Sequence, residues 1–235
     1  NALESDFGAD ADAAALVSRA YIVAPQFWAA DQQQWVTYLS DHYDLLDHWD
    51  ELFWPTAEAW MDGDSSWHTS SAYSTHVGNT NATAMNISSM KVYDELLQAL
   101  GDREAYPNLR KLLVVGFSAG GQFVQRYALG GVAPDALEAR GIRVRFAALS
   151  PSSLAYLDDA RPVRPPRSEL SCAFCDQAHI VEQTYEFAVP NSSSCPAWDV
   201  WKFGLGELNN YMYAAHGDDI AALVTGSGNR TVLYR

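Results

Sequence analysis

The segment that most constrains the fold is residues 111–122, in which an apolar run leads directly into a glycine-rich turn. The four apolar residues 112–115 predict a buried strand, and Gly116-Phe-Ser-Ala-Gly120 follows at once. The residues from 122 onward predict a helix. A G-x-S-x-G turn between a strand and a helix presents its serine hydroxyl at the carboxyl end of a parallel strand. We expect Gly116 and Gly120 to be glycine because side chains there would collide in so tight a reversal.

This arrangement gives two residues candidate chemical roles. Ser118 would lie at the tip of the turn with its hydroxyl exposed, as a nucleophile requires. The backbone N–H of Ala119, at the start of the following helix, could donate to a developing oxyanion. The alternative interpretation is a purely structural turn, because two glycines and a serine also occur at this spacing by chance.

The other elements alternate between strands and helices along the chain. We expect strands at 20–25, 143–150 and from 230, the first of them fully buried. We expect helices at 10–19, at 88–100, from 122 through about 129, and at 218–226. This order predicts an α/β fold, a mostly parallel sheet with right-handed crossovers and helices on both faces. Residues 1–235 would form a single domain. Residues 152–217 are too long and irregular for an ordinary loop and would form an insertion.

The composition excludes several functional classes and suggests a compartment. A net charge of −14 argues against binding to nucleic acid or anionic membranes, which requires clustered Lys and Arg. No apolar run approaches the roughly 20 residues of a membrane span. Four N-x-S/T sequons and grouped cysteines suggest a secreted glycoprotein with a disulfide. The sequon residues are Asn81, Asn86, Asn191 and Asn229, and the cysteines are Cys172, Cys175 and Cys195.

Three cysteines can close at most one disulfide within the chain. Cys195 is expected to pair with Cys175 or with a cysteine outside this sequence. Cys172-Ala-Phe-Cys175 has the spacing of a redox or zinc motif, but no further ligands stand nearby. We therefore predict no metal site, and the chemistry of a nucleophilic serine requires no cofactor.

Together these segments resemble the α/β-hydrolase superfamily, and more closely a poorly characterised group of secreted hydrolases. The similarity lies in residues 22–27, 116–128, 151–157, 161–162 and 201–205. It implies that Ser118 is the nucleophile and that the Ala119 amide is half of the oxyanion hole. It also implies that the insertion at 152–217 is a lid, in which Trp198, Trp201 and Phe203 shape the substrate pocket.

The resemblance places the remaining catalytic groups outside this sequence. In this fold the serine is followed by an acid and then a histidine, and both would come after Arg235. The loop that completes the oxyanion hole would precede Asn1. The chain is therefore expected to be an internal part of the domain, completed by missing segments or by a second chain.

Candidates within the chain have simpler alternatives. Asp158 follows the strand after the serine strand, where some members of this fold carry the acid, but a surface turn beside Arg161 is the alternative. The six histidines are weaker candidates for the base. They are His42, His48, His68, His76, His179 and His216. His216 precedes the last strand and so breaks the expected order, and a helix-start or surface position accounts for it better.

Two functional hypotheses follow. The first is a secreted serine hydrolase that acts on an ester through an acyl-enzyme. The second is a non-catalytic extracellular protein, structural or glycan-binding, because six tryptophans in the stretch 26–87 could stack on sugar rings. The structural alternative for these tryptophans is that they fill the interface between this stretch and the sheet.

Overall fold

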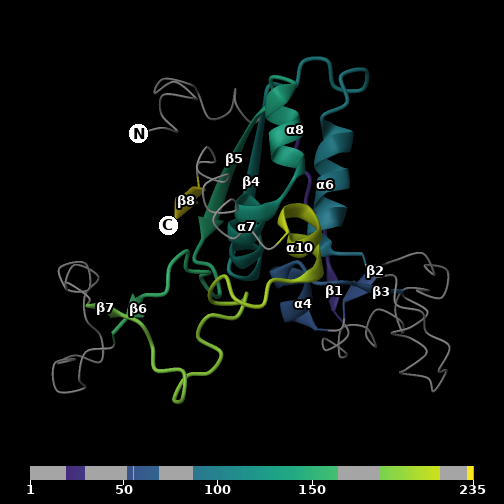
Figure 1. The fold of residues 1–235 in the computed structure, drawn as a ribbon. Coiled ribbons are helices and arrows are strands. Elements are labelled where there is room, and N and C mark those ends of the chain that lie inside the picture. Colours follow the sequence, from purple (N-terminus) through teal and green to yellow (C-terminus); the bar gives the residue numbers. More distant parts are fainter. Residues whose placement is uncertain are drawn as a thin grey trace, which may run out of the picture.

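The fold is mixed α/β, with a small parallel sheet packed against helices. The computed structural model describes residues 20–29, 52–54, 56–68, 87–163, 186–217 and 232–234. Strands β4 (Lys111–Phe117) and β5 (Arg143–Leu149) pair in parallel along their whole length. The short strand β8 (Val232–Tyr234) joins β5 in parallel, which gives the order β4-β5-β8 (Figure 1). The three predicted strands from 111, 143 and 230 are thus confirmed as parallel neighbours.

Three helices pack against the two long strands, two of them at the positions predicted from the sequence and the third, at 133–139, not predicted. The helices expected at 10–19 and 218–226 lie outside the described residues. Helix α6 (Ser89–Leu100) begins at the N-cap Ser88, whose side chain accepts from the N–H of Met90, and ends before Gly101. Helix α7 (Ala119–Gly130) starts directly after Ser118, and α8 (Ala133–Ala139) leads into β5. None of the described helices has the length and apolar character of a bilayer-crossing segment.

The described helices pack on one face of the sheet. Val114 of β4 and Val144 and Phe146 of β5 point into a core shared with α6, α7 and α8. The alternate side chains of β4 point the other way, and Leu113, Val115 and Phe117 are 46%, 51% and 69% exposed. Helices were predicted on both faces of the sheet. Among the described residues, they cover one face only.

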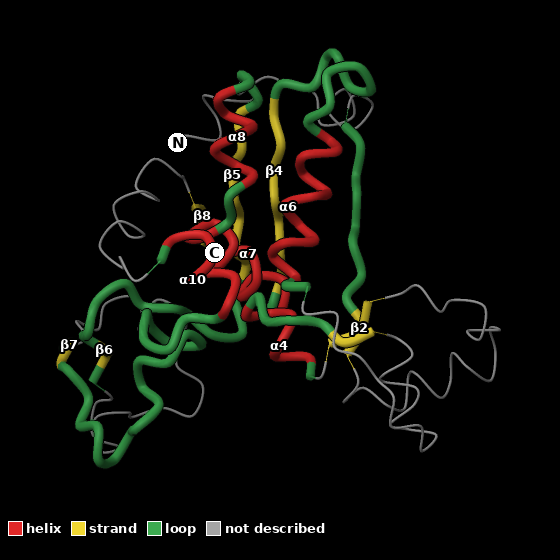
Figure 2. The backbone as a smooth tube through the Cα atoms, turned by 45° about the vertical axis from the view of Figure 1, so that its right-hand side comes forward, coloured by secondary structure: helices red, strands yellow, loops and turns green. Residues whose placement is uncertain are grey.

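The prediction for residues 20–25 was wrong. They form no strand, and Tyr21 and Ile22 are 91% and 88% exposed instead of buried. Pairing begins only at strand β1 (Trp28–Ala29), which follows an extended stretch of chain (Figure 2). An apolar run shows the tendency to form a strand but not whether a partner strand lies within reach, and Pro25 lacks a backbone donor.

A second small sheet stands near the carboxyl ends of the parallel strands. Strand β1 pairs in parallel with β2 (Leu52–Trp54), which pairs antiparallel with β3 (Trp67–His68). Helix α4 (Ala57–Asp62) follows β2 and contacts α7. These elements bring residues from the aromatic stretch against the helix that follows Ser118.

The insertion at 152–217 contains one element that the sequence analysis missed. Helix α10 (Asn210–His216) starts at the N-cap Asn209, whose side chain accepts from the N–H of Met212. In the part of the insertion that the structure describes, the other strands form one antiparallel pair, β6 (Arg161–Pro162) with β7 (Phe187–Ala188). A lone Asn before a short helix is a weak signal in the sequence, which explains why this region was predicted as irregular.

A buried carboxylate ties these helices together. Asp94 of α6 is 0% exposed and accepts from the hydroxyl groups of Tyr127 and Tyr211, each at 2.7 Å. It also accepts from the N–H of Ala133 at 3.0 Å. Burial and the nearby carboxylate raise the pKa of Tyr127. Asp94 therefore links α6 to α7, to the start of α8 and to α10.

We predict that Asp94→Asn lowers the free energy of unfolding by about 2–3 kcal/mol, because an amide has one acceptor oxygen for three donors and lacks the charge. Urea denaturation measures this change. Glu95→Gln is the matched control, since Glu95 is exposed and pairs only with Lys91 on the helix surface; it should change stability by less than about 0.5 kcal/mol. Equal effects of the two substitutions would contradict the role of Asp94.

Candidate active site at the end of strand β4

Ser118 has an unusual backbone conformation at the point where β4 becomes α7. Its φ of 54° and ψ of −114° lie in a region that residues with side chains rarely occupy. Such a conformation costs of the order of 1–3 kcal/mol and persists only where the surroundings impose it. The reversal from strand to helix takes place at this one residue, and its side chain is exposed.

The glycines beside Ser118 make this turn possible, in a way that corrects one prediction. A Cβ on Gly116 would lie 2.0 Å from the carbonyl oxygen of Gly120, so Gly116 is required as predicted. A Cβ on Gly120 would meet nothing within 4 Å, so Gly120 contributes its backbone and not the lack of a side chain. The second tight position is Gly121, where a Cβ would lie 2.7 Å from the carbonyl oxygen of Leu149.

Backbone hydrogen bonds join the Ser118 turn to the end of the neighbouring strand. The N–H of Ser118 donates to the carbonyl of Leu149 at 3.0 Å, and the N–H of Ser152 donates to the carbonyl of Ser118 at 3.1 Å. Between them, Ser150 has a φ of 40°, also unusual for a residue with a side chain. The last residue of β5 thereby holds the N–H of Ser118, and the loop after β5 holds its carbonyl.

The hydroxyl group of Ser118 lies next to a second hydroxyl. The Ser118 Oγ–Ser152 Oγ distance is 3.3 Å, and both residues are exposed. Within the described ranges this is the hydrogen bond that the structure gives to Ser118 Oγ, and no described histidine or carboxylate reaches that atom. Among the described residues, the side-chain contact of Ser118 Oγ is therefore a second hydroxyl and not a basic group.

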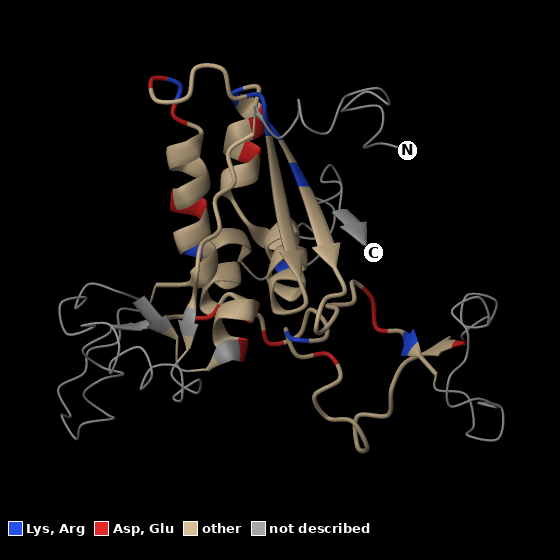
Figure 3. Cartoon of the chain, turned by 180° about the vertical axis from the view of Figure 1, so that it is seen from behind, with Lys and Arg blue, Asp and Glu red and all other residues tan. Residues whose placement is uncertain are grey.

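The start of α7 supplies positive potential at the same point. Ala119 is the first residue of α7, and the Ser118 side chain does not cap the helix. Uncapped N–H groups at a helix start favour a negative charge on a ligand. The basic side chains of the two long strands, Lys111, Arg143 and Arg145, lie at the opposite end of the sheet (Figure 3). The position of Ala119 suits a donor to an oxyanion.

Polar side chains on one side of α7 fix it to α4. Gln122 Nε2 donates to Asp62 Oδ1 at 2.8 Å, and Arg126 Nε lies 3.1 Å from the same oxygen. The Arg126 side chain is fully buried. Burial raises the pKa of Asp62, while the Arg126 charge and the Gln122 hydrogen bond act in the opposite direction. The indole of Trp201 and the amide of Asn209 donate to the Asp62 carbonyl, so the insertion joins this network.

The same side of α7 holds the loop after β5. Gln125 makes two hydrogen bonds with the backbone of Ala155, one to its carbonyl and one from its N–H, both at 3.0 Å. Arg126 donates to Ser153 Oγ at 3.0 Å and to the carbonyl of Lys202. Sequence reasoning missed these contacts. The signal was the polar set Gln122, Gln125 and Arg126, spaced along one helix face in an otherwise apolar segment.

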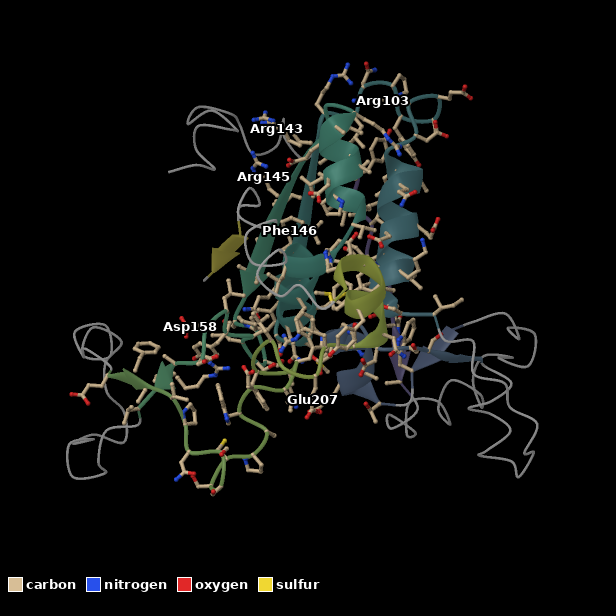
Figure 4. All side chains as sticks on the ribbon, viewed as in Figure 1. Arg103, Arg143, Arg145, Phe146, Asp158 and Glu207 are labelled. Carbon is tan, nitrogen blue, oxygen red and sulfur yellow. The ribbon has the colours of Figure 1, made fainter. Side chains whose placement is uncertain are left out.

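Of the other candidate catalytic groups, the two whose side chains the structure describes, Asp158 and His216, make contacts elsewhere. Asp158 is exposed, and its Oδ1 accepts from the N–H of Ala160 at 2.8 Å in a local turn (Figure 4). His216 Nε2 lies 2.7 Å from the carbonyl oxygen of Gly130, between α10 and α7. The side chain of His68 and the residues His42, His48, His76 and His179 lie outside what the structure describes.

One sequon and one cysteine fall on described residues. Asn191 is exposed, and its Oδ1 accepts from the N–H of Ser193 at 2.9 Å. Cys195 is exposed and forms no disulfide with another described residue. Its expected partner Cys175 lies outside the described residues, as do Cys172, Asn81, Asn86 and Asn229. The described residues contain no cluster of His, Cys, Asp or Glu that could hold a metal ion.

The tryptophans whose side chains the structure describes are buried or partly buried. Trp54 is 2% exposed, and Trp60 stacks on Phe27 with a ring-centroid distance of 5.4 Å. Trp201, expected at a pocket, is 4% exposed. Trp198 lies under the guanidinium of Arg161. Trp54 and Trp201 are therefore core residues and do not present a surface to a sugar.

Comparisons of this chain with protein-family models, with curated proteins and with solved structures found no match. Its function is accordingly inferred from the geometry around Ser118.

We predict that Gly116→Ala destabilises the protein by at least about 2 kcal/mol, because the methyl group would collide with the backbone of Gly120. Gly120→Ala is the matched control in the same turn, and there the methyl group enters open space. It should leave stability unchanged or raise it by up to about 1 kcal/mol, because alanine favours a helix. Thermal unfolding followed by circular dichroism compares the two. Equal tolerance of both substitutions would contradict the tight turn.

Proposed function

We propose that this protein is a serine hydrolase of the α/β-hydrolase type, which acts on a carboxylic ester through Ser118. The observation that carries the proposal is the strained backbone of Ser118, which holds an exposed hydroxyl between a parallel strand and a helix. The cost of this conformation is difficult to explain for a turn that only connects two elements. It is the geometry of a nucleophile that must project beyond the sheet.

The proposed reaction has two stages. Ser118 Oγ attacks the ester carbonyl carbon and loses its proton to a general base, while the N–H of Ala119 donates to the oxyanion. Collapse of this intermediate breaks the bond to the alcohol, which leaves with the proton from the base. Water then attacks the acyl-serine with help from the same base, releasing the carboxylic acid and restoring the Ser118 hydroxyl.

The general base and its acid come from outside the described residues in this proposal. The resemblance to the fold implies that the base is a histidine and that a carboxylate orients it. Asp158 remains the candidate acid within this sequence. To serve as one, its carboxylate would have to leave the turn hydrogen bond with Ala160.

The insertion at 152–217 is proposed to act as a lid over the substrate. Its described loops around β6 and β7 lie beyond the carboxyl end of β5, the end of the sheet at which Ser118 follows β4, whereas α10 lies beside α7 (Figures 1 and 2). Arg161 organises it through an ion pair with Asp199 at 3.1 Å and through the faces of Tyr156 and Trp198. Phe203 is 38% exposed and is one described aromatic residue of the insertion that could contact an acyl or alcohol group.

The second candidate function is a non-catalytic extracellular protein with the same fold. It is favoured by one observation, namely that Ser118 Oγ contacts Ser152 and no described base. The burial of Trp54 and Trp201 argues against the version of this hypothesis in which these tryptophans bind a glycan. Sugar binding that survives Ser118→Ala would favour this second function.

Labelling with a fluorophosphonate tests the hydrolase proposal. We predict a covalent adduct on the peptide that contains Ser118 in the native protein, and none in Ser118→Ala, because only an activated serine reacts with this probe. Ser194→Ala, an exposed serine of the insertion, is the matched control and should label as the native protein does. A correctly folded native protein without an adduct at Ser118 would exclude catalysis by this residue.

The proposed location is extracellular, with a glycan on Asn191. Its Oδ1 is held by the N–H of Ser193, and its amide nitrogen remains at the surface. Peptide mapping after enzymatic glycan removal in heavy-oxygen water should label Asn191, and Ser193→Ala should abolish the label by removing the sequon. Unmodified Asn191 in the protein recovered from its secretory source would count against glycosylation there.

A further inference from the structure

We propose that Ser152 is a positioning residue for the reaction at Ser118. In this proposal the hydroxyl of Ser152 donates a hydrogen bond to Ser118 Oγ. This inference rests on the proposed hydrolase function. It adds a residue that the serine turn motif does not contain, because Ser152 follows the neighbouring strand β5. The observation that carries it is the 3.3 Å separation of the two hydroxyl oxygens.

Backbone contacts fix Ser152 relative to Ser118. The N–H of Ser152 donates to the carbonyl of Ser118, and the N–H of Ser118 donates to the carbonyl of Leu149. The Pro151 backbone packs closely as well, since a Cβ on Gly121 would lie 3.1 Å from its Cα. Main-chain hydrogen bonds therefore hold the two residues next to each other, so the proximity of their hydroxyl groups does not depend on a chance approach of two surface loops.

Side chains of α7 hold the residues that follow. Gln125 binds both backbone groups of Ala155, and Arg126 donates to Ser153 Oγ. These contacts are buried or partly buried, while the Ser152 side chain between them and Ser118 is exposed. The loop is thus fastened on both sides of Ser152, and its hydroxyl is left on the surface beside the nucleophile.

The reaction chemistry favours one direction for the hydrogen bond, in which Ser152 donates and Ser118 accepts. A serine hydroxyl can donate one hydrogen bond and accept two. If Ser152 donates to Ser118 Oγ, the proton of Ser118 remains available for a general base, and the Ser118 side chain is held in one rotamer. Donation to that oxygen also stabilises the negative charge that develops as the proton leaves. Both effects raise the rate of attack without changing how the probe or substrate binds.

The test measures how fast a fluorophosphonate reacts with Ser118 in the native protein and in two variants. Ser152→Ala should lower the maximal labelling rate about five- to tenfold, as expected for loss of one hydrogen bond to the nucleophile, and leave the probe concentration at half-maximal rate unchanged. Ser152→Thr keeps the hydroxyl and should restore the rate to within about twofold. A thermal melt checks that both variants fold.

The outcomes separate this inference from the proposed function. Normal labelling of Ser152→Ala at Ser118 would overturn the role of Ser152 and leave the hydrolase proposal standing. Slow labelling of both variants alike would also overturn it, because the hydroxyl would then not be the cause. Absence of any adduct in the native protein would overturn the hydrolase proposal, and the role of Ser152 with it.

Discussion

The structure around Ser118 depends on the backbone hydrogen bonds between the ends of two parallel strands. Ser118 donates to Leu149 and accepts from Ser152, so the turn after β4 and the loop after β5 hold each other. Without these bonds, little would keep a residue with a side chain at a φ of 54°. The parallel register of β4 and β5 brings both ends to the same level, and Phe117 and Leu149 are direct partners.

Packing behind the turn makes this arrangement rigid. The polar face of α7 binds α4 through Asp62 and the loop after β5 through Ala155, while its apolar face enters the core. Asp94 fixes the other end of α7 through Tyr127. A helix fastened at several points transmits little movement to its first residue, which is what a nucleophile and an oxyanion donor both require.

The sequence predicted the part of the fold that depends on local patterns. The strand, turn and helix around Ser118, the helix that ends before Gly101 and the strand from 143 follow from apolar patterns and glycine positions. The prediction of a buried strand at 20–25 was wrong because such a strand requires a partner strand, and a local pattern cannot reveal one. Gly121 was missed because its crowding comes from Leu149, 28 positions away in the chain.

Of the candidate site, the sequence could predict only the turn around Ser118. Ser118 and Ala119 belong to one short motif, whereas Ser152, Gln125 and Arg126 act through contacts between distant segments. A serine after a strand carries no signal of its own. The proximity of Ser152 to Ser118 can be inferred only when the register of β4 and β5 is known.

A crystal structure of the native protein after reaction with a phosphonate ester tests the central claim most directly. The account predicts a phosphorus atom bonded to Ser118 Oγ, a phosphoryl oxygen within hydrogen-bond distance of the Ala119 N–H, and a positive φ at Ser118. A Ser118 with ordinary helical or extended backbone, and with its hydroxyl enclosed by packed side chains, would contradict it.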